Sequence, residues 1–123
     1  MAGILDHVGF NVADFDKSRA FYVAALAPLG ITMLFGDEKW AMFGRDGAGA
    51  FWVGQMGPVP GPIHLAFAAA DRAAVRAFHA AALAAGGKDN GGPGLRDYHP
   101  NYYGAFIIDP DGHNIEAVCH MPE

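Results

Sequence analysis

The chain has 123 residues, of which 52% are hydrophobic and 17% charged, with a formal net charge of -5. This length and composition predict one folded domain and exclude a disordered chain. The eight lysines and arginines are scattered and outnumbered by thirteen acids, so we expect no nucleic-acid partner. Charges interrupt the Ala-rich stretch 66–85, and the opening residues lack a basic secretion signal. We therefore expect a cytoplasmic protein with no membrane partner.

The first half of the chain predicts a strand, a helix and three shorter strands. Apolar side chains alternate with small or polar ones across 6–12, which is the period of a half-buried strand. Asp14 stands where a helix N-cap belongs, and the pattern that follows predicts a helix near 14–28. Turn signals then separate expected strands at 31–35, 40–43 and 50–53.

The second half repeats this pattern 57 residues later. Aligning His7–Gly30 with His64–Gly87 gives twelve identical residues in twenty-four positions. Asp71 matches Asp14 as a helix cap. The remaining elements are an expected strand at 63–67, a helix at 71–86, a weak strand near Arg96 within a long loop at 86–100, and strands at 102–108 and 114–118. The sequence therefore predicts an α+β fold: a single domain, 1–123, built of two βαβββ modules at about 4–54 and 63–119.

Two histidines and one carboxylate form a candidate metal site. His7 and His64 occupy matching places in the two modules, on the strand faces that alternation turns away from the helices. Glu116 lies on the same face of the last expected strand, within the otherwise apolar run NIEAV. Each could instead be an isolated polar residue satisfied by hydrogen bonds, but an unpaired buried carboxylate is costly. Two imidazoles and a carboxylate suit one divalent ion of Zn, Ni, Mn, Fe or Co with open coordination positions.

Three segments, DHVGFNVADFDKSRAFY, HLAF and DPDGHNIEAV, resemble the vicinal oxygen chelate superfamily. That group includes glyoxalases, bleomycin-resistance proteins, extradiol dioxygenases and fosfomycin-resistance thiol transferases. The resemblance implies paired βαβββ modules whose curved mixed sheets form a cup around a divalent metal. It also implies His7, His64 and Glu116 as the metal ligands, with Glu116 a candidate catalytic residue.

The fourth ligand position of the family differs in this chain. Aligning the turn at 46–47 with the turn at 111–112 places Phe51 opposite Glu116, where four-ligand glyoxalases carry a glutamate. Phe51 can neither bind a metal nor act as a base, so we do not expect ordinary lactoylglutathione lyase activity. Phe106 stands where extradiol dioxygenases and thiol transferases carry a tyrosine. We expect Phe51, Phe106 and Tyr102 to line the substrate site.

His99, in the run HPNYY, is a second candidate catalytic residue, since an imidazole can act as an acid or base near neutral pH. The alternative is that this run is a structural turn with aromatic packing.

Three functions stay open. The first is a metal-dependent enzyme of the glyoxalase-like lyase or isomerase kind, in which the metal chelates vicinal oxygens of a small-molecule substrate. The alternatives are a metal-free drug- or metabolite-binding protein of the bleomycin-resistance kind and an extradiol-type dioxygenase. The high aromatic content also predicts a homodimer. The modules could pair within one chain or by exchange between two.

Overall fold

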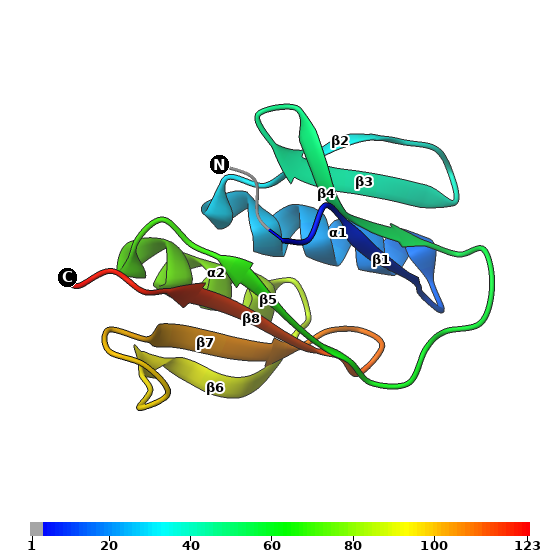
Figure 1. The fold of residues 1–123 in the computed structure, drawn as a ribbon. Helices are drawn as coiled ribbons and strands as arrows, with labels where there is room; N and C mark the ends of the chain where they lie inside the picture. Colours follow the sequence, from blue (N-terminus) through cyan, green and yellow to red (C-terminus); the bar gives the residue numbers. More distant parts are fainter. Residues whose placement is uncertain (1–3) are drawn as a thin grey trace.

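Each half of the chain forms one β-α-β-β-β unit in the computed structural model, which describes residues 4–123 (Figure 1). The first unit contains β1 (Val8–Asn11), α1 (Phe15–Leu26), a 3₁₀ turn (Ala27–Leu29), β2 (Thr32–Gly36), β3 (Trp40–Arg45) and β4 (Ala48–Gly54). The second contains β5 (His64–Ala68), α2 (Arg72–Ala84), β6 (Lys88–Leu95), β7 (Tyr103–Ile108) and β8 (Asn114–Cys119). The expected α+β fold of two repeated units is confirmed.

Each unit forms its own four-stranded mixed sheet. The strand order is β1-β4-β3-β2 in sheet 1 and β5-β8-β7-β6 in sheet 2. In both sheets the first strand lies parallel to the last, and the other pairings are antiparallel. The repeat in the sequence is therefore also a repeat in strand pairing.

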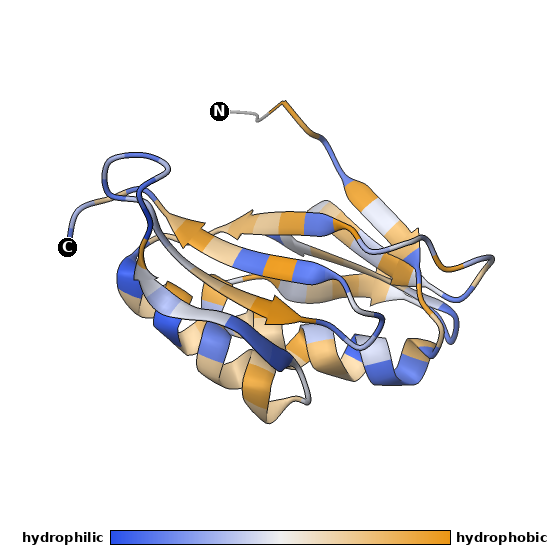
Figure 2. Ribbon diagram, turned by 90° about the horizontal axis from the view of Figure 1, so that it is seen from below, coloured by the Kyte–Doolittle hydropathy of each residue, from blue (hydrophilic) through white to orange (hydrophobic). Residues whose placement is uncertain are grey.

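Both helices pack on the same side of the two sheets (Figure 2). Their N-caps are the expected ones, because the carboxylate of Asp14 accepts from Lys17 N and that of Asp71 accepts from Ala74 N. One hydrophobic core lies between helices and strands and spans both units. The opposite side of the sheets, which we call the open face, carries His64, Ala66 and Ala68 of β5, all exposed.

Contacts between the units set β1 and β5 side by side in opposite directions. The hydroxyl of Tyr22 on α1 donates to the carboxylate of Asp109, beside the β7–β8 turn, at 2.5 Å. The ring of Phe10 in β1 lies 4.7 Å from that of His113, whose Nδ1 accepts from Ile63 N just before β5. The end of β1 is therefore near the start of β5.

The segment expected as a long loop at 86–100 is in part a strand. β6 covers 88–95 and pairs with β7 through two register shifts. Gly91 takes a φ of 144° beside one of these irregularities, a conformation that favours glycine. Pairing with a neighbouring strand thus overrides the low strand propensity of the sequence KDNGGPGL.

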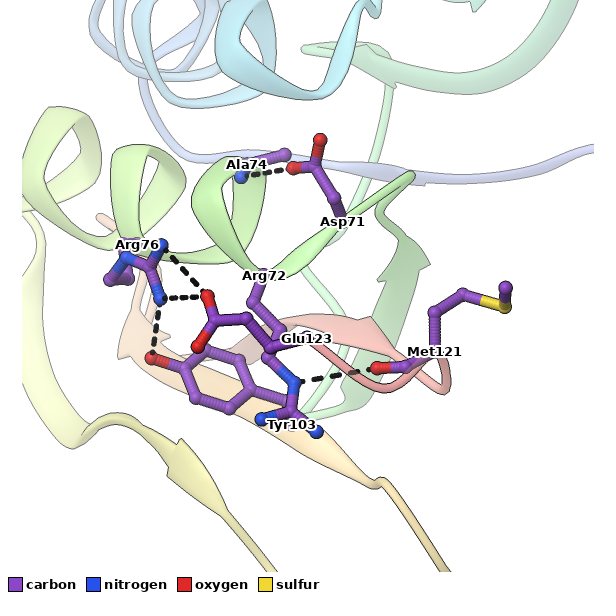
Figure 3. Close-up of polar contacts among 7 residues, drawn as sticks. All are labelled: Asp71, Arg72, Ala74, Arg76, Tyr103, Met121 and Glu123. Carbon is purple, nitrogen blue, oxygen red and sulfur yellow. Dashed lines mark hydrogen bonds and ion pairs between the residues drawn. The ribbon is translucent and has the colours of Figure 1, made fainter.

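The C-terminal residues lie against α2 (Figure 3). Arg72 Nε donates to the carbonyl of Met121, and Arg76 donates to both the Tyr103 hydroxyl and the Glu123 carboxylate. These contacts hold the segment that follows β8. Within residues 4–123, no helix has the length and apolar character needed to cross a membrane.

Candidate metal centre

His64 and Glu116 come together on the open face of sheet 2. β5 and β8 are parallel with Ala66 opposite Glu116, so the side chains of His64 and Glu116 project from the same face. His64 Nε2 lies 2.8 Å from Glu116 Oε1. The side chain of Glu116 is 1% exposed, whereas that of His64 is 54% exposed.

The spacing of this pair fits two neighbouring ligands of one ion. Donor atoms about 2.1 Å from a shared ion, at roughly a right angle, are about 3 Å apart. An imidazole nitrogen and a carboxylate oxygen also match the donor types that first-row divalent ions accept. The same 2.8 Å separation is also that of a direct hydrogen bond between the two side chains.

The second oxygen of Glu116 is held by Tyr102. The Tyr102 hydroxyl donates to Glu116 Oε2. Burial, followed by the hydrogen bond to Glu116 and its negative charge, raises the pKa of Tyr102 to about 12, so the phenol keeps its proton at neutral pH. Each oxygen of the buried carboxylate therefore has its own partner.

His7 lies away from this pair within one chain. It precedes β1, its side chain is 55% exposed, and its Nδ1 is 2.7 Å from Asp6 Oδ1. It lines a cavity of about 500 Å³ with Ala66 and Ala68, toward the far end of β5 from His64. At roughly 3.3 Å per residue, His64 and Ala68 are about 13 Å apart along that strand.

Within residues 4–123, no group of three or more His, Cys, Asp or Glu side chains is placed to hold an ion. The convergence of His7 with His64 and Glu116, expected from the sequence, is therefore absent within a single chain. The antiparallel approach of β1 and β5 is the cause, because it puts the two repeat-related histidines at opposite ends of the strand pair.

The strand register shows which residue of the first unit is equivalent to Glu116 in the second. Glu116 pairs with Ala66, and the repeat-related Gly9 pairs with Trp52. Trp52, not Phe51, therefore occupies the position equivalent to Glu116. Counting from the turn at 46–47 was wrong by one residue because β3 and β4 shift register beside that turn, and a shift of one moves a side chain to the other face.

Phe51 belongs to the core on the helix side. It is 1% exposed, and its ring packs against those of Tyr22, Phe10 and Phe67 at 5.0, 5.5 and 5.3 Å. Phe51 also forms part of the wall of the cavity that His7 lines.

The open face of sheet 1 carries aromatic side chains, whereas that of sheet 2 carries the polar pair His64 and Glu116. A Cβ built on Gly9 would lie 2.0 Å from Trp52 Cε2, so the indole occupies the space above this glycine. Met42 is the cross-strand partner of Trp52. On the neighbouring strands, the rings of Phe35 and Trp40 meet edge to face at 5.7 Å.

The other predicted site residues lie at increasing distance from the pair. Phe106 is the cross-strand neighbour of Glu116, and its ring is 6.2 Å from that of His64. Arg96 lies over the Phe106 ring at 5.3 Å. His99 is exposed, and its ring is 6.0 Å from that of Tyr102, which lies between His99 and Glu116. Trp52 is the site residue that sequence reasoning missed, because the register shift between β3 and β4 that determines its face leaves no signal in the sequence.

Comparison with known proteins is consistent with this architecture. Residues 4–117 match the model of the Glyoxalase/Bleomycin resistance protein/Dioxygenase superfamily. The comparison with curated proteins found no match.

Solved structures in the same fold include three from different organisms. A glyoxalase/bleomycin resistance protein from Albidiferax ferrireducens is 33% identical, with a TM-score of 0.82 over 98% of this chain and 100% of that one. A putative glyoxalase from Bacillus halodurans is 25% identical, with a TM-score of 0.70 over 95% of this chain and 96% of that one. A variant of glyoxalase I from Zea mays shares the fold at 24% identity and a TM-score of 0.70, over 97% of this chain and 45% of that one.

With a family match over nearly the whole length and the paired sheets that the family implies, the chain belongs to the Glyoxalase/Bleomycin resistance protein/Dioxygenase superfamily.

Proposed function

We propose that the protein is a metal-dependent enzyme of the glyoxalase-like lyase or isomerase kind, acting on a small molecule with two adjacent oxygen atoms. The observation that supports it is the His64–Glu116 pair, in which a carboxylate 1% exposed lies 2.8 Å from an imidazole nitrogen. A buried charge of this kind is usually paired with a cation or a metal. A divalent ion held there would act as a Lewis acid on the two substrate oxygens.

The surrounding side chains would bind and orient the substrate. Arg96 brings a positive charge over Phe106, beside the pair, and would attract an anionic substrate group. The Trp52 indole lies on sheet 1, as Gly9 does, so it would face the pair from a second copy of the chain and exclude water there. Glu116 would act by holding the ion, because its Oε1 faces His64 and its Oε2 already accepts from the Tyr102 hydroxyl.

His7 would come to the site from a second copy of the chain. Within one copy, His7 and the His64–Glu116 pair lie toward opposite ends of β5. A two-fold axis that reverses the strand direction would set His7 of each copy against the pair of the other. The proposed homodimer thus holds two equal sites, each with three protein ligands.

Mixing two variants, each of which lacks one of the proposed ligands, tests this arrangement. We expect His7→Ala and His64→Ala homodimers to bind Co²⁺ weakly, because each site has lost one ligand. In an unfolded and refolded 1:1 mixture, half of the dimers are mixed and one of their two sites is intact, so about a quarter of the wild-type sites should return. Titration calorimetry measures the recovered sites.

Recovery of no sites in the mixture would contradict the shared site, provided that native mass spectrometry, with one variant labelled with ¹⁵N, shows the mixed dimers. Refolded wild-type protein, which must regain all its sites, is the control.

A second candidate function, metal-free binding of a planar ligand, is favoured by one observation. The position equivalent to Glu116 carries Trp52, and aromatic rings continue across the open face of sheet 1. A stacking surface of this kind suits a flat ligand. Untagged protein, purified without chelator, separates the two functions: the enzyme retains close to one divalent ion per chain, and the binding protein retains none.

A further inference from the structure

We infer that Tyr102 is a positioning residue that fixes Glu116 as a one-oxygen metal ligand. This inference rests on the proposed metal site. It assigns to Tyr102 a role through Glu116, in place of the direct substrate contact expected from the sequence.

The two oxygens of Glu116 are divided between two partners. Oε1 faces His64 Nε2 at 2.8 Å, and Oε2 accepts from the Tyr102 hydroxyl. An ion bound between Nε2 and Oε1 would replace the hydrogen of that contact and leave the Tyr102 bond intact. Without the phenol, the carboxylate could rotate and offer both oxygens to the ion, or present neither in the correct direction.

The backbone makes room for the Tyr102–Glu116 contact at Gly104. A Cβ at this position would lie 3.2 Å from Tyr102 Cε1 and 3.3 Å from Glu116 Oε2. Both distances are tighter than ordinary van der Waals contact. Any larger side chain at residue 104 would therefore press between the phenol and the carboxylate.

Tyr102 itself is held in place before any ion binds. Its carbonyl accepts from Arg96 N at 2.8 Å, and its N–H donates to the His99 carbonyl at 3.2 Å. Its ring meets those of Tyr98 and His120 edge to face at 5.0 and 5.2 Å. The phenol thus orients the carboxylate from a fixed position, as outer partners of metal ligands do.

Cobalt binding to Tyr102→Phe tests the inference. We expect the variant dimer to bind Co²⁺ roughly 10- to 100-fold more weakly than wild type, the usual effect of losing such an outer partner. We also expect a weaker visible absorption band, because a carboxylate that binds through both oxygens raises the coordination number. Tyr103→Phe is the matched control: it removes a hydroxyl from the helix side of β7 and should change neither value.

Unchanged or tighter Co²⁺ binding by Tyr102→Phe would overturn the inference and leave the proposed function standing. Failure of the wild type to bind Co²⁺ would overturn both. Should Tyr102→Phe fail to fold, Gly104→Ala keeps the phenol but crowds its contact with Glu116. We expect it to lower the affinity in the same direction, and an unchanged affinity would again overturn the inference.

Discussion

The indole of Trp52 lies over the backbone of Gly9, in the space that a side chain at residue 9 would fill. The pair joins β4 to β1 on the open face, where the matching pair in the second unit is Glu116 and Ala66. One repeat therefore places an aromatic ring where the other places a buried carboxylate.

Replacing Gly9 with alanine should displace the indole. In a strand, this change ordinarily stabilises a protein by about 0.5–1 kcal/mol. Here we expect the free energy of unfolding to fall instead, and the tryptophan fluorescence to shift, because the new Cβ would overlap the ring. Gly92→Ala in β6 is the control, since a Cβ at that position meets nothing within 4 Å.

Introducing glutamate at residue 52 should add a fourth metal ligand. We expect Trp52→Glu to bind Co²⁺ roughly tenfold more tightly than wild type, because residue 52 is the register equivalent of Glu116. Phe51→Glu is the contrasting variant and should fail to fold, because it buries a charge among aromatic rings. Calorimetry and circular dichroism measure the two outcomes. Tighter binding by a folded Phe51→Glu protein would mean that the register assignment is wrong.

Removing the charge of Glu116 should weaken metal binding and leave the fold intact. Glu116→Gln keeps the shape of the side chain, but it no longer offsets the charge of the ion. Metal content after identical purification is the measurement, and Asp16→Asn, an exposed acid on α1, is the control. Equal metal content in wild type and Glu116→Gln would remove Glu116 from the ligand set.

The Tyr22–Asp109 contact should make stability fall at alkaline pH. Burial, followed by the negative charge of Asp109, raises the pKa of Tyr22 well above 10.0. A group whose pKa is raised on folding stabilises fully below its unfolded pKa and loses this contribution as the pH rises above it. We therefore expect the free energy of unfolding to decrease above about pH 10.

Tyr22→Phe should show a smaller decrease over the same range and lower stability at pH 7, by about 1–3 kcal/mol, because Asp109 loses a hydrogen-bond partner. Chemical unfolding at several pH values measures both effects. If the free energy of unfolding fell equally steeply above pH 10 in wild type and Tyr22→Phe, the decrease would come from other groups, among them Tyr102.

Local sequence signals predicted the elements that depend on local physics. Asp14 and Asp71 marked both helix starts because an N-cap is satisfied within its own turn. Alternation placed His64 and Glu116 on one face because strand period does not depend on the partner. The 57-residue repeat predicted two units with the same order of elements.

Features set by partners far along the chain were missed. β6 could not be predicted from a glycine-rich segment, because its order comes from pairing with β7. The register of Trp52 depended on an irregularity between β3 and β4 that leaves no residue signature. The separation of His7 from His64 followed from the direction in which β1 and β5 approach each other, which neither unit determines alone.

That opposed direction of β1 and β5 couples ion binding to association of the chains. If each ion takes His7 from one copy and the His64–Glu116 pair from the other, its binding energy is available only to the dimer. By thermodynamic linkage, the ion then strengthens the dimer by as much as the dimer strengthens ion binding. Dilution and chelation become equivalent ways of separating the chains, and the supply of the ion sets the protein concentration at which two sites assemble.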